Sequence, residues 1–598
     1  MGGICAIIGE AGDPELPERL DRMLGRSPYR GSPARRIEGG IALGVQSLRG
    51  DASLGERGPY VVAFHGWIGN WEELAQASGI DLRGAANDAE RLAGAFEALG
   101  TSAFARLRGE FATVVLGRRS GSVVAARDVV GMRPLFVHRQ AGRTFVGAEI
   151  RQTLAGSGAT AELDEVVLAS FLTDRYGAGE RTIFTGVERV VPGHAYAFDA
   201  ARPNDAPAAA PYWMPPTEER RCAKSEGALA EELRFILDRA VGRTLAARAG
   251  AVALSGGMDS STVWALARRR ANAGDDSARN VGAISLAFPG FECDEACLVA
   301  EIVGATGGGL ASVDAGAVPP FGAVERLTEF VEEPFFATLY HDQLIAEAAR
   351  AHGREVVYFG FGGDEWMAGS AHYLGDELRR GHPIRTVAEG WALLHGTKRE
   401  KLRKLGGFTV APLGGFPWRR QRLMPGWLHP VRRAMLLPPL PVISSSRTGQ
   451  VLWRTLARHR AACYMGNVEL VSACQGIEIR CPLHDLDLIE FAFRTPGRAF
   501  MGGRREKHLL RVAMAGLLPA SVVEREEKAE FSSPFRRGAV SFARLEDVPR
   551  WRLGARELVA AGQVEHMRQE LAAGRGAEYL YDFLNLAIAE RCCRHFDF

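Results

Sequence analysis

The 598-residue chain has almost no net charge, few cysteines and no long apolar run. Its 73 lysines and arginines nearly balance 71 acidic residues, so no overall field directs it to nucleic acid or a membrane. No segment approaches the roughly 18 apolar residues of a membrane-spanning helix, and the start MGGICAIIG lacks the basic region of a secretory signal. The nine cysteines form no paired CxxC motifs, which argues against structural zinc and a disulfide framework. We therefore expect a cytoplasmic protein with no transmembrane segment and no nucleic-acid partner.

The sequence does contain two differently patterned halves. Up to about residue 200, short β-type runs alternate with turns and two helical stretches, which predicts a sheet-rich α+β domain over 1–205. A stretch rich in proline and alanine follows, and we expect a linker over 206–222. Residues 223–598 alternate apolar runs with helical patterns, the rhythm of a doubly wound parallel sheet. The chain is thus predicted to be a multidomain α/β protein.

The most informative stretch is 251–263, AVALSGGMDSSTV. Its first four residues have the length and composition of a buried parallel strand. Ser255-Gly256-Gly257 then allows a sharp turn, and a helical segment follows. A strand, a glycine-rich turn and a helix N-terminus together form an anion site. Asp259 inside this turn is explained if a divalent cation bridges it to phosphate oxygens.

The string SGGMDS resembles the pyrophosphate loop of the ATP-pyrophosphatases, which split ATP into AMP and pyrophosphate; the alternative is a plain strand-to-helix turn. The resemblance implies ATP as a cofactor. It also implies a set of nucleotide-binding residues in this loop and the next strand: Leu254, Ser255, Gly256, Gly257, Asp259, Ser260 and Ser285.

A second loop, GFGGDE at 360–365, directly follows the apolar run VVYF. It resembles the metal loop of asparagine synthetase-like enzymes, which implies that Gly360, Gly362 and Gly363 form the turn and that Asp364 binds Mg²⁺ together with Asp259. Two carboxylates from separate loops suit Mg²⁺, since this ion keeps waters and takes few protein ligands. The alternative is that Asp364 only caps a short helix.

Two further stretches resemble the same enzymes. In GIEIRCPL, beginning at residue 476, Glu478 matches the family's glutamate and is an acid–base candidate, although a structural pair with Arg480 explains it equally well. In 505–535, Lys528 matches the lysine that stabilises charge developing at the α-phosphate and acyl carbon. Lys507 in the same stretch is a second candidate, for phosphate contact or for a role in the fold.

The first domain resembles the class II, Ntn-type glutamine amidotransferases, through GGICAIIG, YRGSP, HGWIGN, LRGEFATVVLG and ARDVVGMRPLF. That family uses a cysteine directly after the initiator methionine. Position 2 is Gly2 in this chain, His65-Gly66-Trp67 replaces the glutamine-binding Asn-Gly-Glu, and Ser47 replaces an arginine. The resemblance therefore implies an α+β sandwich that has lost glutaminase activity, with Cys5 a small core residue.

Residues 376–450 form a basic insert that contains Trp391, Trp418 and Trp427. It could bind a peptide, a partner protein or acidic lipid. A solvated helical surface anchored by buried tryptophans is the simpler interpretation.

The combined resemblance spans almost the whole chain and implies an ATP-dependent carbon–nitrogen ligase that forms AMP. The length near 600, Phe361 and the stretch FPGFECDE, which ends with Cys293-Asp294-Glu295, are most similar to the lasso peptide cyclases. Such an enzyme adenylates an Asp or Glu side chain of a precursor core peptide and closes the ring with its N-terminal amine, beside a leader peptidase and a leader-binding protein. The alternatives are an asparagine synthetase or β-lactam-type synthetase, and a nucleotide-binding scaffold without turnover.

Overall fold

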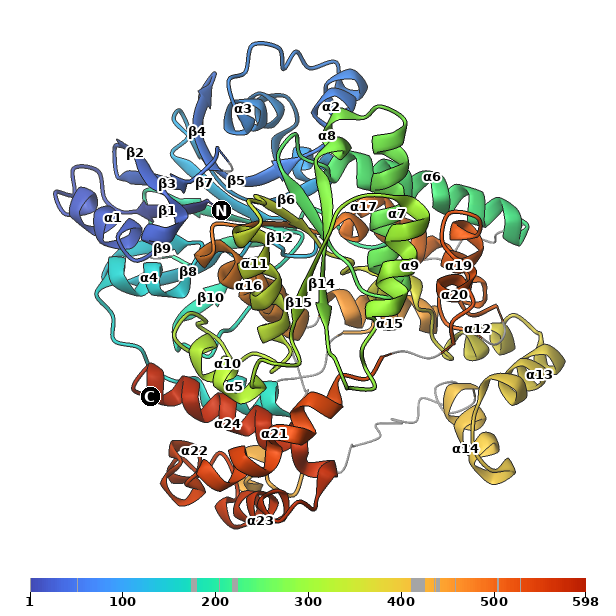
Figure 1. Ribbon diagram of the computed structural model, residues 1–598. Coiled ribbons are helices and arrows are strands. Elements are labelled where there is room, and N and C mark those ends of the chain that lie inside the picture. The colour runs from blue at the N-terminus through green and yellow to red at the C-terminus, as the bar shows by residue number, and fades with distance from the viewer. Residues whose placement is uncertain are drawn as a thin grey trace.

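The computed structural model has two parts, a blue N-terminal one built on antiparallel sheets and a C-terminal one built on a parallel sheet (Figure 1). This is the predicted fold class. The structure describes residues 2–50, 52–173, 180–203, 205–217, 224–409, 425–434, 436, 441–457, 459–502, 505–526 and 529–598. No helix among these described residues is long and apolar enough to cross a membrane.

The N-terminal part is a sandwich of two six-stranded sheets, in the orders β10-β8-β9-β1-β3-β2 and β12-β11-β7-β6-β5-β4. Alternation along β1 explains the layers: Ile4, Ala6 and Ile8 face the second sheet, whereas Cys5 and Ile7 pack under a helix. Cys5 is fully buried, as expected of a core residue. The strands are β1 Gly3–Ile8, β2 Ser32–Glu38, β3 Ile41–Ser47, β4 Ala52–Arg57, β5 Tyr60–Ile68, β6 Gly109–Gly117, β7 Ser122–Arg127, β8 Phe136–Gln140, β9 Arg143–Gly147, β10 Val187–Arg189, β11 His194–Asp199 and β12 Ala208–Pro211.

The strand β12 changes the prediction for the linker 206–222. Its residues Ala208–Pro211 pair with His194–Ala197 of β11 and extend the second sheet by one edge strand. The small side chains of this run leave an extended backbone free to pair, and its proline lies at an edge, where a missing N–H is tolerated. Residues 218–222 of the predicted linker lie outside the described residues.

The C-terminal part is built on a five-stranded parallel sheet in the order β15-β14-β13-β16-β17. The order reverses between β13 and β16, so the loops that follow these two strands open at a topological switch point, where ligands bind in such sheets. The strands are β13 Gly250–Ala253, β14 Val281–Ala287, β15 Leu310–Asp314, β16 Val356–Tyr358 and β17 Glu478–Arg480.

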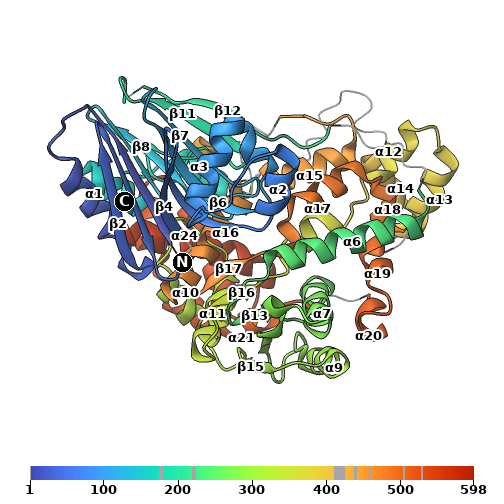
Figure 2. The same cartoon turned by 90° about the horizontal axis from the view of Figure 1, so that it is seen from above.

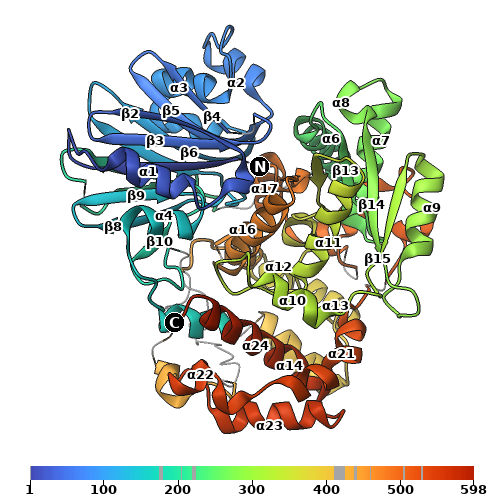
Figure 3. The ribbon, with the colours of Figure 1, turned by 60° about the vertical axis from the view of Figure 1, so that its left-hand side comes forward.

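Helices cover both faces of this sheet, and a red C-terminal group lies below it (Figure 3). The long helix α6 buries an apolar stripe that includes Leu229, Leu233 and Leu237. The helices of this part are α6 Glu226–Thr244, α7 Met258–Asn272, α8 Asp276–Arg279, α9 Ala296–Thr306, α10 Pro320–Leu327, α11 Leu339–Ala351, α12 Tyr373–Arg379, α13 Pro383–Leu393, α14 Lys398–Thr409, α15 Arg447–Ala457, α16 His459–Cys474, α17 Leu486–Arg494, α18 Gly497–Met501, α19 His508–Met514, α20 Ala520–Val523, α21 Ser532–Leu545, α22 Arg552–Ala555, α23 Ala561–Ala572 and α24 Leu580–His595.

The first sandwich carries its own helices. Helix α1 lies on the sheet that contains β1, and α3 packs against β4 and β5 of the other sheet. These helices are α1 Leu16–Leu24, α2 Trp71–Ser78, α3 Asp88–Leu99, α4 Ile150–Ser157 and α5 Glu165–Leu172.

The basic insert forms α13 and α14 at the edge of the molecule (Figure 2). Trp427 is buried and its indole N–H donates to Asp582 over 3.0 Å, so this tryptophan is an anchor. Trp391 is 39% exposed beneath the ammonium of Lys401. Trp418 lies outside the described residues.

Candidate functional site

The two glycine-rich loops meet at the carboxyl ends of β13 and β16. They pack so closely that a Cβ added to Gly363 would lie 2.0 Å from Cγ of Asp259, and one on Gly360 would lie 2.7 Å from the backbone nitrogen of Ser260. Gly362 also has a φ of 105°, in the left-handed region that favours glycine. These glycines are therefore required for the two aspartates to approach each other.

Lys507 joins the two predicted metal ligands. Its Nζ lies 2.6 Å from Oδ2 of Asp259 and 2.6 Å from Oδ1 of Asp364. Burial alone would lower the pKa of Lys507, but the two carboxylates raise it above its usual value. The residue is 5% exposed and its φ is 58°, a strained conformation for a lysine. A side chain held in this way belongs to the site rather than to a solvated surface.

The first loop is tied together by its own serines. Ser255 donates its backbone N–H to Oγ of Ser260 over 3.0 Å, and Gly257 donates its N–H to Oγ of Ser255 over 3.2 Å. Gly256 donates its N–H to a carboxylate oxygen of Glu295 over 3.1 Å. Glu295 in turn pairs with Arg525. A loop amide therefore already contacts an anionic oxygen, as expected at the N-terminus of α7.

Leu254 and Ser285 lie where two strands run side by side. Leu254 donates its backbone N–H to the carbonyl of Ile284 over 2.8 Å, and Ser285 is the next residue along β14. Ser285 is 4% exposed. Their role in binding the nucleotide stays a prediction.

The carboxylates of Asp259 and Asp364 converge on one position, and the ammonium of Lys507 lies between them there. Two convergent carboxylates are a ligand set that fits Mg²⁺, because phosphate oxygens and waters complete its coordination. No group of three or more His, Cys, Asp or Glu side chains suited to a metal occurs among the described residues, so an all-protein metal cage is not formed there.

Glu478 is not brought to these loops. It opens β17 in register with Val356, at the end of the sheet opposite to the loop that follows β16. Its carboxylate accepts from Arg480 Nε over 2.7 Å and pairs with Arg248. The structural pair with Arg480, which the sequence left open, is the arrangement that forms, and strand register is the reason. Lys528 lies outside the described residues.

Close to Gly2, where the family's catalytic cysteine would lie, the first domain packs against the second. Arg30, fully buried, forms two hydrogen bonds of 2.8 and 2.9 Å with Glu469 of α16, and it also contacts Glu149 and the carbonyl of Gly2. A Cβ on Gly2 would lie 2.4 Å from that of Ala52, so a cysteine does not fit at this position. Figure 3 shows the N-terminus at the junction of the two parts.

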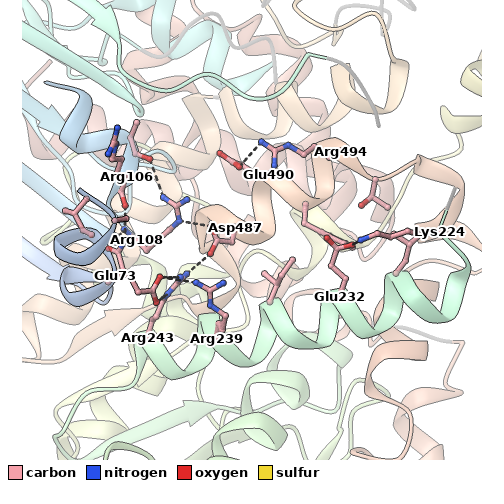
Figure 4. Close-up of a pocket in the computed structure, with 18 residues that line it drawn as sticks. Glu73, Arg106, Arg108, Lys224, Glu232, Arg239, Arg243, Asp487, Glu490 and Arg494 are labelled. Atoms are coloured by element: carbon pink, nitrogen blue, oxygen red, sulfur yellow. Dashed lines mark hydrogen bonds and ion pairs between the residues drawn. The ribbon is translucent and has the colours of Figure 1, made fainter. Parts of the chain in front are cut away.

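A charged cavity of about 730 Å³ lies between α2 and α6 (Figure 4). Its cations are largely paired with its own acids: Arg243 contacts Glu73 and Asp487, and Lys224 contacts Glu232. None of the loop residues of the candidate site lines this cavity. It is part of the domain junction.

Comparison with known families identifies an ATP-dependent, amide-forming ligase. The sequence model of the asparagine synthase family matches residues 232–588, and that of a glutamine amidotransferase domain matches residues 1–213. Since the first match covers more than half of the chain, the protein belongs to the asparagine synthase family.

The curated relatives are distant. A Mycobacterium tuberculosis protein, named provisionally as a glutamine-hydrolysing asparagine synthetase, is 27% identical over 526 residues, which cover 80% of this chain and 75% of the relative. Asparagine synthetase 3 of Bacillus subtilis, also named glutamine-hydrolysing, is 23% identical over 82% of this chain and 77% of the relative. A solved glutamine phosphoribosylpyrophosphate amidotransferase from B. subtilis aligns with a TM-score of 0.27 and 12% identity, over 60% of this chain and 81% of that one.

Proposed function

We propose that this ligase forms a macrolactam in lasso peptide biosynthesis. It adenylates an Asp or Glu side chain of a precursor core peptide and joins that carbonyl to the peptide's own N-terminal amine, with release of AMP and pyrophosphate. A leader peptidase and a leader-binding protein would supply the peptide. The observation that carries the proposal is the packing around Gly2, since the buried Arg30–Glu469 pair and the crowding against Ala52 leave no room there for a catalytic cysteine.

The residues of the site have separate tasks in this reaction. The loop amides around Gly256 and the N-terminus of α7 bind the phosphates of ATP. Asp259 and Asp364 would hold Mg²⁺, which neutralises charge on the pyrophosphate. Lys507 supplies positive charge beside both carboxylates. Lys528 is proposed to stabilise charge at the acyl centre.

The side chain at position 361 supports an internal amine. Phe361 stacks on Phe359 with ring centroids 4.9 Å apart and gives the metal loop an apolar surface. A benzyl side chain neither accepts nor donates a proton. Holding a tethered amine next to the activated carbonyl can lower the barrier by about 7–11 kcal/mol, which suits a ring closure.

Asparagine synthesis from free aspartate and ammonia is the second candidate, because the family and the names of both relatives favour it. The two candidates differ in their substrates and use the same ATP site.

Pyrophosphate release separates them. The enzyme is incubated with ATP and Mg²⁺, and with either peptides encoded by short reading frames beside its gene or free aspartate plus ammonia. We expect release that requires a peptide and a product lighter by one water. Asp364→Asn should reduce release at least ~100-fold. Asp205→Asn, at an exposed aspartate, should not. Release with aspartate and ammonia alone would replace the peptide proposal with asparagine synthesis.

A further inference from the structure

A polar pair lies behind the apolar loop residue Phe361. The hydroxyl of Tyr464, on α16, donates to Oδ2 of Asp342, on α11, over 2.7 Å. The Tyr464 ring meets Phe361 edge to face, with ring centroids 5.8 Å apart and an interplanar angle of 83°. Phe361 is three residues before Asp364, so the pair borders the loop that carries a predicted metal ligand.

The Asp342 carboxylate is costly to keep where it is. It is 6% exposed, and within the part of the chain that the structure describes its pKa is set by burial and hydrogen bonds, with no cation among the causes. Burial raises the pKa of Asp342 to about 7, although the hydrogen bond from Tyr464 opposes this. A carboxylate buried without a cation destabilises the fold, which points to a use in chemistry. Tyr464 is half-buried, and burial together with the Asp342 charge raises the pKa of its hydroxyl.

Other carboxylates near the loops are already engaged. Glu365 accepts the backbone N–H of Gly362 over 2.8 Å and holds the metal loop in shape. Glu478 lies among arginines at the opposite end of the sheet. Within the described residues, Tyr464 contacts Phe361 and is hydrogen-bonded to Asp342, so this pair can move a proton beside position 361.

We propose that Tyr464 is the acid–base residue of the amide-forming step and that Asp342 acts through it as the proton acceptor. This inference rests on the proposed function, whichever amine is used. It assigns to two separate helices the proton transfer that Phe361 cannot perform.

The proton balance is complete without another reactant. The amine nitrogen forms a bond to the acyl carbon of the adenylate. One N–H proton passes to the Tyr464 oxygen while the tyrosine proton passes to the Asp342 carboxylate. The bond from the acyl carbon to the AMP oxygen then breaks, with its electron pair leaving on AMP. Asp342 returns its proton to solvent after product release. A base with a pKa near the working pH is the efficient choice for this transfer.

The test separates the two half-reactions. ATP–pyrophosphate exchange reports adenylation, and mass spectrometry reports amide formation, with the peptides and the aspartate–ammonia mixture used above. We expect Tyr464→Phe to keep exchange within about threefold and to lower the amide-forming kcat about 100-fold or more, without an equal change in KM. Tyr212→Phe removes a buried hydroxyl from the first domain, where it donates to the carbonyl of Arg127. We expect it to change neither activity.

The pH dependence of amide formation distinguishes a role in proton transfer from a purely structural role, which would leave it unchanged. With wild type, amide formation should rise with pH through about 7, as Asp342 ionises. Among the described residues, Cys481 is coupled electrostatically to Asp342 and Glu365 to Tyr464, and burial raises the pKa of both Cys481 and Glu365. Asp342→Asn should therefore lose the rise near 7 while keeping exchange.

Each outcome decides between the two ideas. If wild type makes amide and Tyr464→Phe makes it equally fast, only this inference is wrong. Loss of exchange together with amide formation in Tyr464→Phe would show a structural role and would also overturn it. If wild type shows no pyrophosphate exchange with any of the peptides or with aspartate and ammonia, the proposed function itself fails.

Discussion

Single residues of this protein are placed by charge balance. The Lys507 ammonium lies 2.6 Å from each of two carboxylates, those of Asp259 and Asp364. Without this positive charge the two carboxylates would repel each other. The Arg30 guanidinium is matched in the same way by Glu149 and Glu469. Asp342 breaks this pattern, because its partner is the neutral hydroxyl of Tyr464.

The stability of the fold should therefore depend on pH through Asp342. Its pKa is raised from 3.8 to about 7 on folding. A raised carboxyl pKa gives stability that is fully present below the unfolded value and is lost as pH rises through the folded one. The free energy of unfolding of Asp342→Asn, relative to that of wild type, should thus increase by a few kcal/mol when the pH is raised from about 4 to about 8. One pKa unit corresponds to about 1.4 kcal/mol.

Urea unfolding of both proteins at these two pH values measures the difference. The same comparison for Asp205→Asn, which alters an exposed side chain, should show no pH-dependent gain. An unchanged difference between wild type and Asp342→Asn would mean that folding does not raise the pKa of this carboxyl.

At the scale of elements, the two loops should be intolerant of any side chain between them. Gly363→Ala places a methyl group 2.0 Å from Cγ of Asp259, so one loop must move. We expect ATP–pyrophosphate exchange to fall at least ~10-fold, since misplaced groups cost this much or more.

Gly227→Ala is the matched control. This glycine lies in α6, where an added Cβ meets nothing within 4 Å. The substitution should leave exchange unchanged and stabilise the helix by about 0.5–1 kcal/mol. Normal exchange in Gly363→Ala would show that the two loops need not touch during catalysis.

Local pattern explains what the sequence predicted. A buried strand, a glycine turn and a helix are adjacent in the chain, so 251–263 and 356–365 could be interpreted without tertiary information, and a parallel sheet then brings their ends together. The apolar stripe of α6 is likewise a local pattern of the sequence. The replacement of the catalytic cysteine by Gly2 was likewise a local fact.

Long-range geometry explains what the sequence did not predict. The register of β17 sends Glu478 to the end of the sheet away from the loops, and no local signal gives that register. Tyr464 and Asp342 come from helices 122 residues apart. The central position of Lys507 depends on a left-handed backbone at an ordinary lysine. The edge strand β12 forms from an alanine run, although alanine on its own favours helix.

On the scale of the whole molecule, a buried ion pair joins the first domain to the second and should stabilise both. The Arg30–Glu469 contact is fully buried and links segments 439 residues apart. Glu469→Ala leaves the Arg30 charge with only part of its partners, so we expect the free energy of unfolding to fall by about 3–5 kcal/mol. Asp21→Ala removes an exposed partner of Arg35 and should cost less than about 1 kcal/mol.

Denaturant unfolding followed by circular dichroism gives both values. Equal, small effects from the two variants would show that the buried pair does not join the domains. Separate unfolding transitions for the two domains of wild type would also contradict a stabilising contact between them.

The most direct test of the account is product formation by wild type with the adjacent-gene peptides, ATP and Mg²⁺, in the presence and absence of glutamine. The account predicts a peptide lighter by one water, one pyrophosphate released for each ring, and no dependence on glutamine. Glutamate release from glutamine, coupled to asparagine formation from aspartate, would contradict it.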